Sequence, residues 1–307
     1  MREFRTAAVI GTGMMGPGIA VTLATGGLST VILSRTGEGA RRGLEAARAQ
    51  ARLLEEHGLI EQAPALAAST DFEAAVARAD LVVESGPESL AFKQEIFERL
   101  DSLAPPGAVL ASNTSGISIT SIAARCHRPE RVLTTHFWNP PHLMPLVEIV
   151  KGEKTSGEIA LAVRDLLARC GKTPVLVKKD RPGQLGNRLQ MALVREAAHI
   201  VAEGIADAAD VDLAARTGFG LRLPVYGILE HQDVVGLDLG FAVVDYVSRD
   251  LNNEPHGPDI MREMIARGEL GAKAGKGFYD WPAGKLEEVK ARRDGFVLEF
   301  LKNAAGK

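Results

Sequence analysis

The chain has 307 residues and a net charge of −3, with 46% apolar and 24% charged residues. This is a normal globular composition whose basic residues are scattered among acidic ones, so we expect no nucleic-acid partner. The length exceeds what one hydrophobic core usually fills, so we expect two domains.

Strands alternate with helices along the first 180 residues. Apolar runs predict strands at 7–10, 30–33, 81–84, 108–111, 132–136, 147–150 and 175–177, and periodicity predicts helices at 18–25, 38–58, 72–78, 90–103 and 156–170. This alternation favours an α/β fold with a Rossmann-like, doubly wound and mostly parallel sheet that carries helices on both faces.

The pattern changes near residue 180. Helical periodicity continues at 185–202, 208–216, 237–251, 258–267 and 284–307, and no convincing strand follows. We therefore expect a Rossmann-like domain at 1–180 and an all-helical C-terminal domain at 181–307.

Hydropathy and cysteine usage bear on the compartment. A membrane-spanning helix needs about 18 consecutive apolar residues, and no run comes near that length. The first residues show no apolar signal core. The two cysteines, Cys126 and Cys170, form no CxxC pair, so we expect neither a disulfide framework nor a metal site. These features favour a cytoplasmic protein that does not bind a membrane.

A glycine-rich turn follows the first predicted strand. Gly11, Gly13 and Gly16 form a GxGxxG motif directly before a helix, which is the arrangement that holds a dinucleotide pyrophosphate at a helix N-terminus. Met14 and Met15 lie inside the motif, and we expect them to pack around the loop. The alternative is a tight turn with a purely structural role.

The second predicted strand ends in Ser34, Arg35 and Thr36. Sites for NAD usually carry Asp or Glu here to bind the ribose, and a carboxylate would repel a 2′-phosphate. A guanidinium flanked by two hydroxyl groups would instead bind that phosphate. We therefore expect NAD or NADP as cofactor, with NADP suggested by Arg35; the alternative is that Arg35 lies over the adenine ring.

Two polar segments at strand ends can carry chemistry, since open α/β sheets bind ligands there. One contains Ser115 and the other His136. Oxidation of a secondary alcohol needs a base for the hydroxyl proton, and a histidine can take and return a proton near neutral pH. Glu148 lies in the apolar run 146–150, where a buried carboxylate needs a partner.

Several motifs occur in one order along almost the whole chain: GTGMMGPGIA, LVVE with Glu88 and Lys93, SNTS, HFWNP, LVEIVKG, Pro182–Gly183 with Asn187–Arg188, and GKGFY. Together they resemble the 3-hydroxyacyl-CoA dehydrogenase family. The resemblance implies reversible hydride transfer between NAD(P) and the 3-hydroxy group of a small-molecule 3-hydroxy acid or acyl-CoA. It also implies a homodimer formed through the helical domain.

The resemblance assigns roles to single residues. His136 is the base and Glu148 orients it. Ser115 and Asn187 hold the reacting oxygen and the cofactor. The remaining positions that it places near the cofactor are Glu88, Lys93 and Lys273.

The features that bind CoA in the family are weak here. Its serine and lysine positions on the helix after the second strand fall near Ala47 and Leu54, although four arginines in 41–52 remain as phosphate ligands. The double proline after Asn139 and the helical tail resemble the gulonate dehydrogenase/lambda-crystallin branch, whose members oxidise free hydroxy acids. Arg222 would pair with a substrate carboxylate, or is a surface arginine. Gln184 replaces an aromatic residue of the family.

Two alternatives to an acyl-CoA dehydrogenase stay open. One is a dehydrogenase of a hydroxy acid that carries no CoA, such as a sugar acid, a carnitine-like acid or an aromatic hydroxy acid. The other is a protein that binds a dinucleotide without turnover, against which the four intact catalytic positions argue.

Overall fold

The computed structural model describes residues 3–305 and divides into two compact units. Unit 1 runs up to Asn187 and includes the segment from Arg292 onward, and unit 2 is Arg188–Ala291. We expected one boundary after residue 180. Contacts assign the end of the last helix to unit 1, and its Leu298 is buried in the core of that unit.

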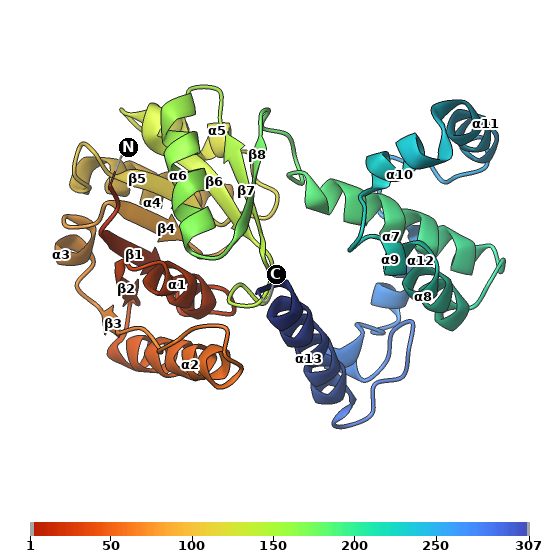
Figure 1. Ribbon diagram of the computed structural model, residues 1–307, viewed down its shortest axis with the longest axis horizontal. Helices are drawn as coiled ribbons and strands as arrows, with labels where there is room; N and C mark the ends of the chain where they lie inside the picture. The colour runs from red at the N-terminus through yellow and green to blue at the C-terminus, as the bar shows by residue number, and fades with distance from the viewer. Residues whose placement is uncertain (1–2, 306–307) are drawn as a thin grey trace. The chain divides into compact units, whose positions relative to one another are not determined.

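Unit 1 is built on an eight-stranded sheet with the order β3-β2-β1-β4-β5-β6-β7-β8 (Figure 1). The strands are β1 (Thr6–Ile10), β2 (Ser29–Leu33), β3 (Leu66–Ser69), β4 (Leu81–Glu84), β5 (Val109–Ser112), β6 (Val132–Phe137), β7 (Leu146–Lys151) and β8 (Thr173–Val177). All neighbours are parallel except β6 and β7. The expected mostly parallel sheet is therefore confirmed.

Helices cover both faces of this sheet. They are α1 (Gly16–Thr25), α2 (Gly37–Glu56), α3 (Phe72–Val76), α4 (Leu90–Leu103), α5 (Ile119–Ile122) and α6 (Gly157–Arg169), with 3-10 turns at Ala123–Arg125 and Pro129–Arg131. Ala7 and Val9 of β1 pack in a core with α1, α2 and α6, and Ala8 packs in a second core with α3, α4 and α5. Burial on both faces explains why these strands are continuous apolar runs.

Two buried ion pairs tether α4 at its ends. At the C-terminal end, Arg131 donates to Asp101 Oδ1 from Nε at 3.0 Å and from Nη2 at 2.8 Å. The backbone amides of His127 and Arg128 donate to Oδ2. Burial alone would raise the pKa of Asp101, but these donors lower it. At the N-terminal end, Lys93 pairs with Glu84, and this contact lies at the candidate site.

Unit 2 is helical, as expected. Its elements are most of α7 (Gly186–Ala202), then α8 (Ala208–Thr217), α9 (Phe219–Arg222), α10 (Ile228–Val235), α11 (Leu237–Val247), α12 (Asp259–Ala266), a 3-10 turn at Ala272–Ala274 and the start of α13 (Lys285–Ala305). Its β structure within residues 188–291 is two isolated bridges, Gly271 with Lys276 and Lys276 with Asp280.

Unit 2 contains a largely apolar cavity of about 640 Å³, open to solvent on one side, between α7, α8, α12 and residues 269–281. No helix within residues 3–305 is long and apolar enough to cross a membrane.

Candidate active site

The glycine loop between β1 and α1 has the shape that a dinucleotide needs. Gly11 has a φ of 119°, and a Cβ there would overlap the carbonyl oxygen of Ser85. A Cβ on Gly16 would overlap the carbonyl oxygen of Gly11, whereas the space beside Gly13 is open. Met15, at the N-cap of α1, caps no amide with its side chain. The first amides of α1 are therefore suited to a pyrophosphate.

The turn after β2 uses its two hydroxyl groups locally. Thr36 caps α2, since its Oγ1 accepts from the amide of Gly39 at 3.1 Å. Ser34 Oγ accepts from the amide of Thr36 at 3.4 Å. Arg35 is exposed and is the charged side chain of this turn.

His136 and Glu148 face each other across β6 and β7, where they are paired in register. Nδ1 of His136 lies 2.7 Å from Oε2 of Glu148, and the two residues are 5% and 0% exposed. Burial alone would raise the pKa of Glu148, but the hydrogen bonds that it accepts lower it to about 2. An ionised carboxylate only accepts, so Nδ1 is the donor and Nε2 of a neutral ring keeps its lone pair.

Three further donors hold Glu148, and sequence reasoning identified none of them. The indole Nε1 of Trp138 donates to Oε2 at 3.1 Å. The amides of Leu185 and Gly186 donate to Oε1 at 2.7 and 2.8 Å. Backbone donors leave no side-chain signal in a sequence. The segment after Pro182 therefore contacts Glu148 through its main chain.

The SNTS segment after β5 joins the glycine loop to the histidine. Asn113 Nδ2 donates to Ser85 Oγ at 3.4 Å, and Ser85 is the residue whose carbonyl lies against Gly11. Oδ1 of the same Asn113 accepts from the amide of Phe137 at 2.9 Å. The Asn113 side chain thus links the glycine loop to β6, the strand that carries His136, at the carboxyl ends of the parallel strands.

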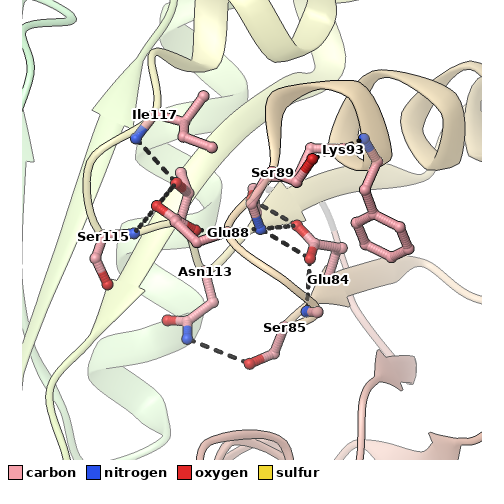
Figure 2. Close-up of polar contacts among 12 residues, drawn as sticks. Glu84, Ser85, Glu88, Ser89, Lys93, Asn113, Ser115 and Ile117 are labelled. Carbon is pink, nitrogen blue, oxygen red and sulfur yellow. Dashed lines mark hydrogen bonds and ion pairs between the residues drawn. The ribbon is translucent and has the colours of Figure 1, made fainter.

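Glu88 holds the turn that presents Ser115 (Figure 2). Its Oε1 accepts from Thr114 Oγ1 at 2.6 Å and from the amides of Ser115 and Gly116, each at 3.0 Å. Ser115 itself is exposed. Asn187 Nδ2 donates to the carbonyl of Ser115 at 3.1 Å, so the structure brings these two expected site residues together.

Lys93 is enclosed by neighbouring side chains in this structure. It is 1% exposed, and its Nζ donates to both carboxylate oxygens of Glu84 at 2.9 Å. Glu84 also accepts from Ser112 Oγ at 2.7 Å. The sequence signal that could have identified Glu84 is the one that identified Glu148: a carboxylate in a strand that is otherwise apolar.

Gln184 has a polar contact near the SNTS segment. It is 3% exposed and has a φ of 55°, in a backbone region that residues other than glycine seldom adopt. Its Nε2 donates to the carbonyl of Thr114 at 3.5 Å. Its Oε1 is buried and has no hydrogen-bond partner within residues 3–305.

Two expected residues lie in unit 2. Lys273 lines the cavity of that unit, and Arg222 is exposed at the end of α9. Among the residues that the structure describes, no three His, Cys, Asp or Glu side chains gather as a metal site would require.

Comparison with known proteins follows the same division of the chain. A family model described as the NAD-binding domain of 3-hydroxyacyl-CoA dehydrogenase matches residues 6–181, and the C-terminal domain of the same enzyme matches residues 183–281. The chain belongs to the 3-hydroxyacyl-CoA dehydrogenase family. Membership confirms the resemblance stated above, the oxidoreductase class and the use of NAD.

Relatives within the family include enzymes that are named for different substrates. The 5-formyl-3-hydroxy-2-methylpyridine 4-carboxylate 5-dehydrogenase of Mesorhizobium japonicum is 34% identical over 292 residues, 94% of each chain. A crystal structure of an enzyme of that activity, described as an NAD⁺-dependent dismutase, has a TM-score of 0.93 at 32% identity and covers 99% of this chain and 100% of its own. The (S)-3-hydroxybutyryl-CoA dehydrogenase of Ralstonia eutropha, also 32% identical, has a TM-score of 0.75 and covers 91% of this chain and 100% of its own.

Proposed function

We propose that this chain catalyses reversible hydride transfer between a nicotinamide dinucleotide and the 3-hydroxy group of a 3-hydroxy acid or its CoA thioester. The 2.7 Å contact between His136 Nδ1 and Glu148 Oε2 carries the proposal. It fixes the tautomer in which Nε2 can take the hydroxyl proton, and it stabilises the imidazolium that forms. In the reverse direction the same Nε2 returns the proton to the new alkoxide.

The other site residues bind and orient. Ser115, exposed on its turn, would hold the reacting oxygen as a neutral hydrogen-bonding group, and Asn187 lies against the same turn. The glycine loop would hold the pyrophosphate on the amides of α1. When bound, the nicotinamide accepts or supplies the hydride.

The turn after β2 supports NADP as an accepted cofactor. Arg35 is exposed and no carboxylate occupies residues 34–36, so a 2′-phosphate meets a cation and no repulsion. Steady-state kinetics with NAD and NADP test this point. A comparable kcat/KM for both supports it, and a preference for NAD above about 100-fold, equivalent to about 3 kcal/mol, contradicts it.

A free acid is the second candidate substrate, and two observations favour it. The family's serine and lysine positions for CoA fall near Ala47 and Leu54, and both of these residues are buried in the core that also contains Leu298 of α13. The structural similarity that extends over 99% of this chain is to an enzyme of a pyridine carboxylate. The second proposal is therefore oxidation of an aromatic hydroxy acid or aldehyde acid without CoA.

A substrate panel separates the two candidates. Reduction of acetoacetyl-CoA and of free acetoacetate would be followed at 340 nm beside oxidation of hydroxymethyl and formyl aromatic carboxylates. A kcat/KM at least 10-fold higher for the thioester supports the first candidate. The reverse order supports the free acid, and no turnover with either class refutes the proposed reaction.

We propose that the chain forms a homodimer through unit 2. Many of its large apolar side chains are exposed, among them Val225 at 80%, Leu229 at 80% and Tyr246 at 77%, and exposed apolar side chains that lie together are typical of association surfaces. Sedimentation at micromolar concentration should give twice the 32.7 kDa mass of one chain.

The free cysteines Cys126 and Cys170 support a reducing compartment, and we propose the cytoplasm.

A further inference from the structure

Trp138 lies directly after β6, two positions beyond His136. Side chains alternate along an extended chain, so residues two apart point to the same side, and Phe137 between them is buried in the core. The imidazole Nδ1 lies 2.7 Å and the indole Nε1 lies 3.1 Å from Oε2 of Glu148. The two rings are tilted by 57° with their centroids 5.9 Å apart. One carboxylate oxygen therefore accepts from two rings at the same strand end.

The indole also packs against the main chain that binds the other carboxylate oxygen. A Cβ added to Gly186 would lie 2.6 Å from Cζ2 of Trp138, so the ring lies directly against this glycine. The amides of Leu185 and Gly186 donate to Oε1 of Glu148 at 2.7 and 2.8 Å. Trp138 therefore contacts both the carboxylate and the backbone segment that holds it from the other side.

The orientation of Glu148 decides whether it can serve His136. Glu148 is fully buried; burial alone would raise its pKa, and the donors around it, the Trp138 indole among them, lower it. A carboxylate bound only at Oε1 could still turn its second oxygen away from the imidazole, which would then lose its acceptor. Because the indole N–H binds Oε2 beside the imidazole, it opposes this rotation.

We propose that Trp138 is a positioning residue for the hydride-transfer reaction: it keeps Oε2 of Glu148 turned to Nδ1 of His136 and so keeps Nε2 free to take the proton. The role requires the indole N–H, which phenylalanine and aliphatic residues lack. This inference rests on the proposed function for its kinetic consequence. Its structural consequence, a hydrogen bond between the indole and the carboxylate, is independent of any substrate.

Two substitutions disturb the contact in different ways. Trp138→Phe removes the N–H and keeps an aromatic ring against Gly186. Gly186→Ala keeps the indole but displaces it from Glu148, because the new methyl group would overlap Cζ2 of the ring. Trp281→Phe is the matched control, since Trp281 is the second of the two tryptophans in the chain and lines the cavity of unit 2.

Kinetics on the full chain separate positioning from ligand binding. The kcat of Trp138→Phe and of Gly186→Ala should fall about 10-fold, equivalent to about 1.4 kcal/mol, which is close to the value of one hydrogen bond to a charged group. KM and the dissociation constant of NADH should stay within about 3-fold of the wild type. The kcat of Trp281→Phe should also stay within about 3-fold. Trp138→Phe/Glu148→Gln should be no slower than Glu148→Gln alone, because Trp138 acts through that carboxylate.

The nuclear magnetic resonance signal of the indole hydrogen reports the contact without a substrate. With two tryptophans in the chain, isotopic labelling of the indole nitrogens gives two signals, and Trp281→Phe identifies that of Trp138. Glu148→Gln replaces a charged acceptor by a neutral and weaker one. The Trp138 signal should therefore move upfield in Glu148→Gln, and its hydrogen should exchange with solvent about 10-fold faster than in the wild type.

Other outcomes overturn the proposal. An indole signal that is the same in Glu148→Gln and the wild type would show that the two side chains are not bonded. Unchanged kcat in both Trp138→Phe and Gly186→Ala would show that Glu148 keeps its orientation without the indole. A raised KM at constant kcat, or additive losses in the double variant, would make Trp138 a ligand contact. If the wild-type chain turned over no substrate, the proposed function would fail, while the indole signals would still decide whether Trp138 holds Glu148.

Discussion

Replacing Glu148 by Gln perturbs one atom of a carboxylate that receives four hydrogen bonds. The donors are His136, Trp138 and the amides of Leu185 and Gly186. An amide has one accepting oxygen, so its NH₂ group must face either the two backbone amides or the indole and the imidazole. A pKa lowered from 4.5 to about 2 corresponds to about 3 kcal/mol of preference for the ionised form in the folded state. We expect the free energy of unfolding to fall by about that amount.

The effect on turnover should be larger than the effect on stability. Without the carboxylate, the imidazole of His136 can adopt the tautomer that presents a hydrogen at Nε2, and it then cannot take a proton. The same change in a Ser-His-Asp triad costs roughly 10⁴-fold in kcat, and we expect roughly 10³- to 10⁴-fold for Glu148→Gln. Urea unfolding and the initial rate at 340 nm give the two quantities.

Asp101→Asn is the matched control for Glu148→Gln. Asp101 is a buried carboxylate that likewise accepts from backbone amides and a cation, but it lies at the C-terminal end of α4. The Asp101→Asn variant should be less stable than the wild type. Its kcat should stay within about 3-fold of the wild-type value, a difference in activation free energy of under 1 kcal/mol. The reasoning is refuted if Glu148→Gln keeps a kcat near that of the wild type, or if both variants lose turnover equally.

Four further predictions follow from individual contacts. His136→Gln should abolish turnover and leave the dissociation constant of NADH unchanged; residual turnover near the wild-type rate would remove His136 as the base. Arg35→Asp should lower kcat/KM for NADP at least 10-fold while sparing NAD, and an equal loss for both would contradict contact with a 2′-phosphate. Leu298→Ala should cost about 2–4 kcal/mol, measured by urea unfolding, because it empties a site in the unit 1 core; an unchanged midpoint would place the tail outside that core. Because the pKa of Glu148 is lowered, its stabilisation is complete above about pH 4.5 and is lost as the pH falls towards 2, so acid titration of Glu148→Gln should lack that part of the loss.

The layers of unit 1 could be predicted because burial on both faces leaves a strong signal. Strands such as β1 and β4 are short apolar runs bounded by turns, and helices alternate with them. The sequence did not predict β3, because Leu66–Ser69 contains two alanines and no β-branched residue. In unit 2, the sequence did not predict α10 because the hydrophobic pattern of this segment is weak. Gly236, with a φ of 97°, separates α10 from α11.

The structure places several predicted site residues in contact. A partner for Glu148 could be expected because a carboxylate in an apolar strand needs one, and the resemblance to the family implied that His136 is that partner. The geometry adds what periodicity cannot show: β7 runs antiparallel to β6, and this direction puts the two residues in register. The donors from the backbone of Leu185 and Gly186 have no side-chain signature, so no reading of residue types could have found them.

Lys93 shows the opposite limit. Its spacing from Glu88 could be read from the sequence, but whether a lysine faces a ligand or the core depends on the side chains around it. Glu84, nine residues earlier, accepts two hydrogen bonds from its ammonium group. The sequence therefore could not show that this ammonium group is paired with a buried carboxylate.

Transfer of deuterium tests the central claim most directly. The chain would be incubated with reduced nicotinamide dinucleotide that carries deuterium as the transferable hydride, together with each oxidised member of the substrate panel, and the products would be analysed by mass spectrometry. The account predicts one deuterium on the carbon that gains the hydroxyl group, with wild-type protein and not with His136→Gln. Equal labelling by His136→Gln, or no labelled product from any member of the panel, would contradict it.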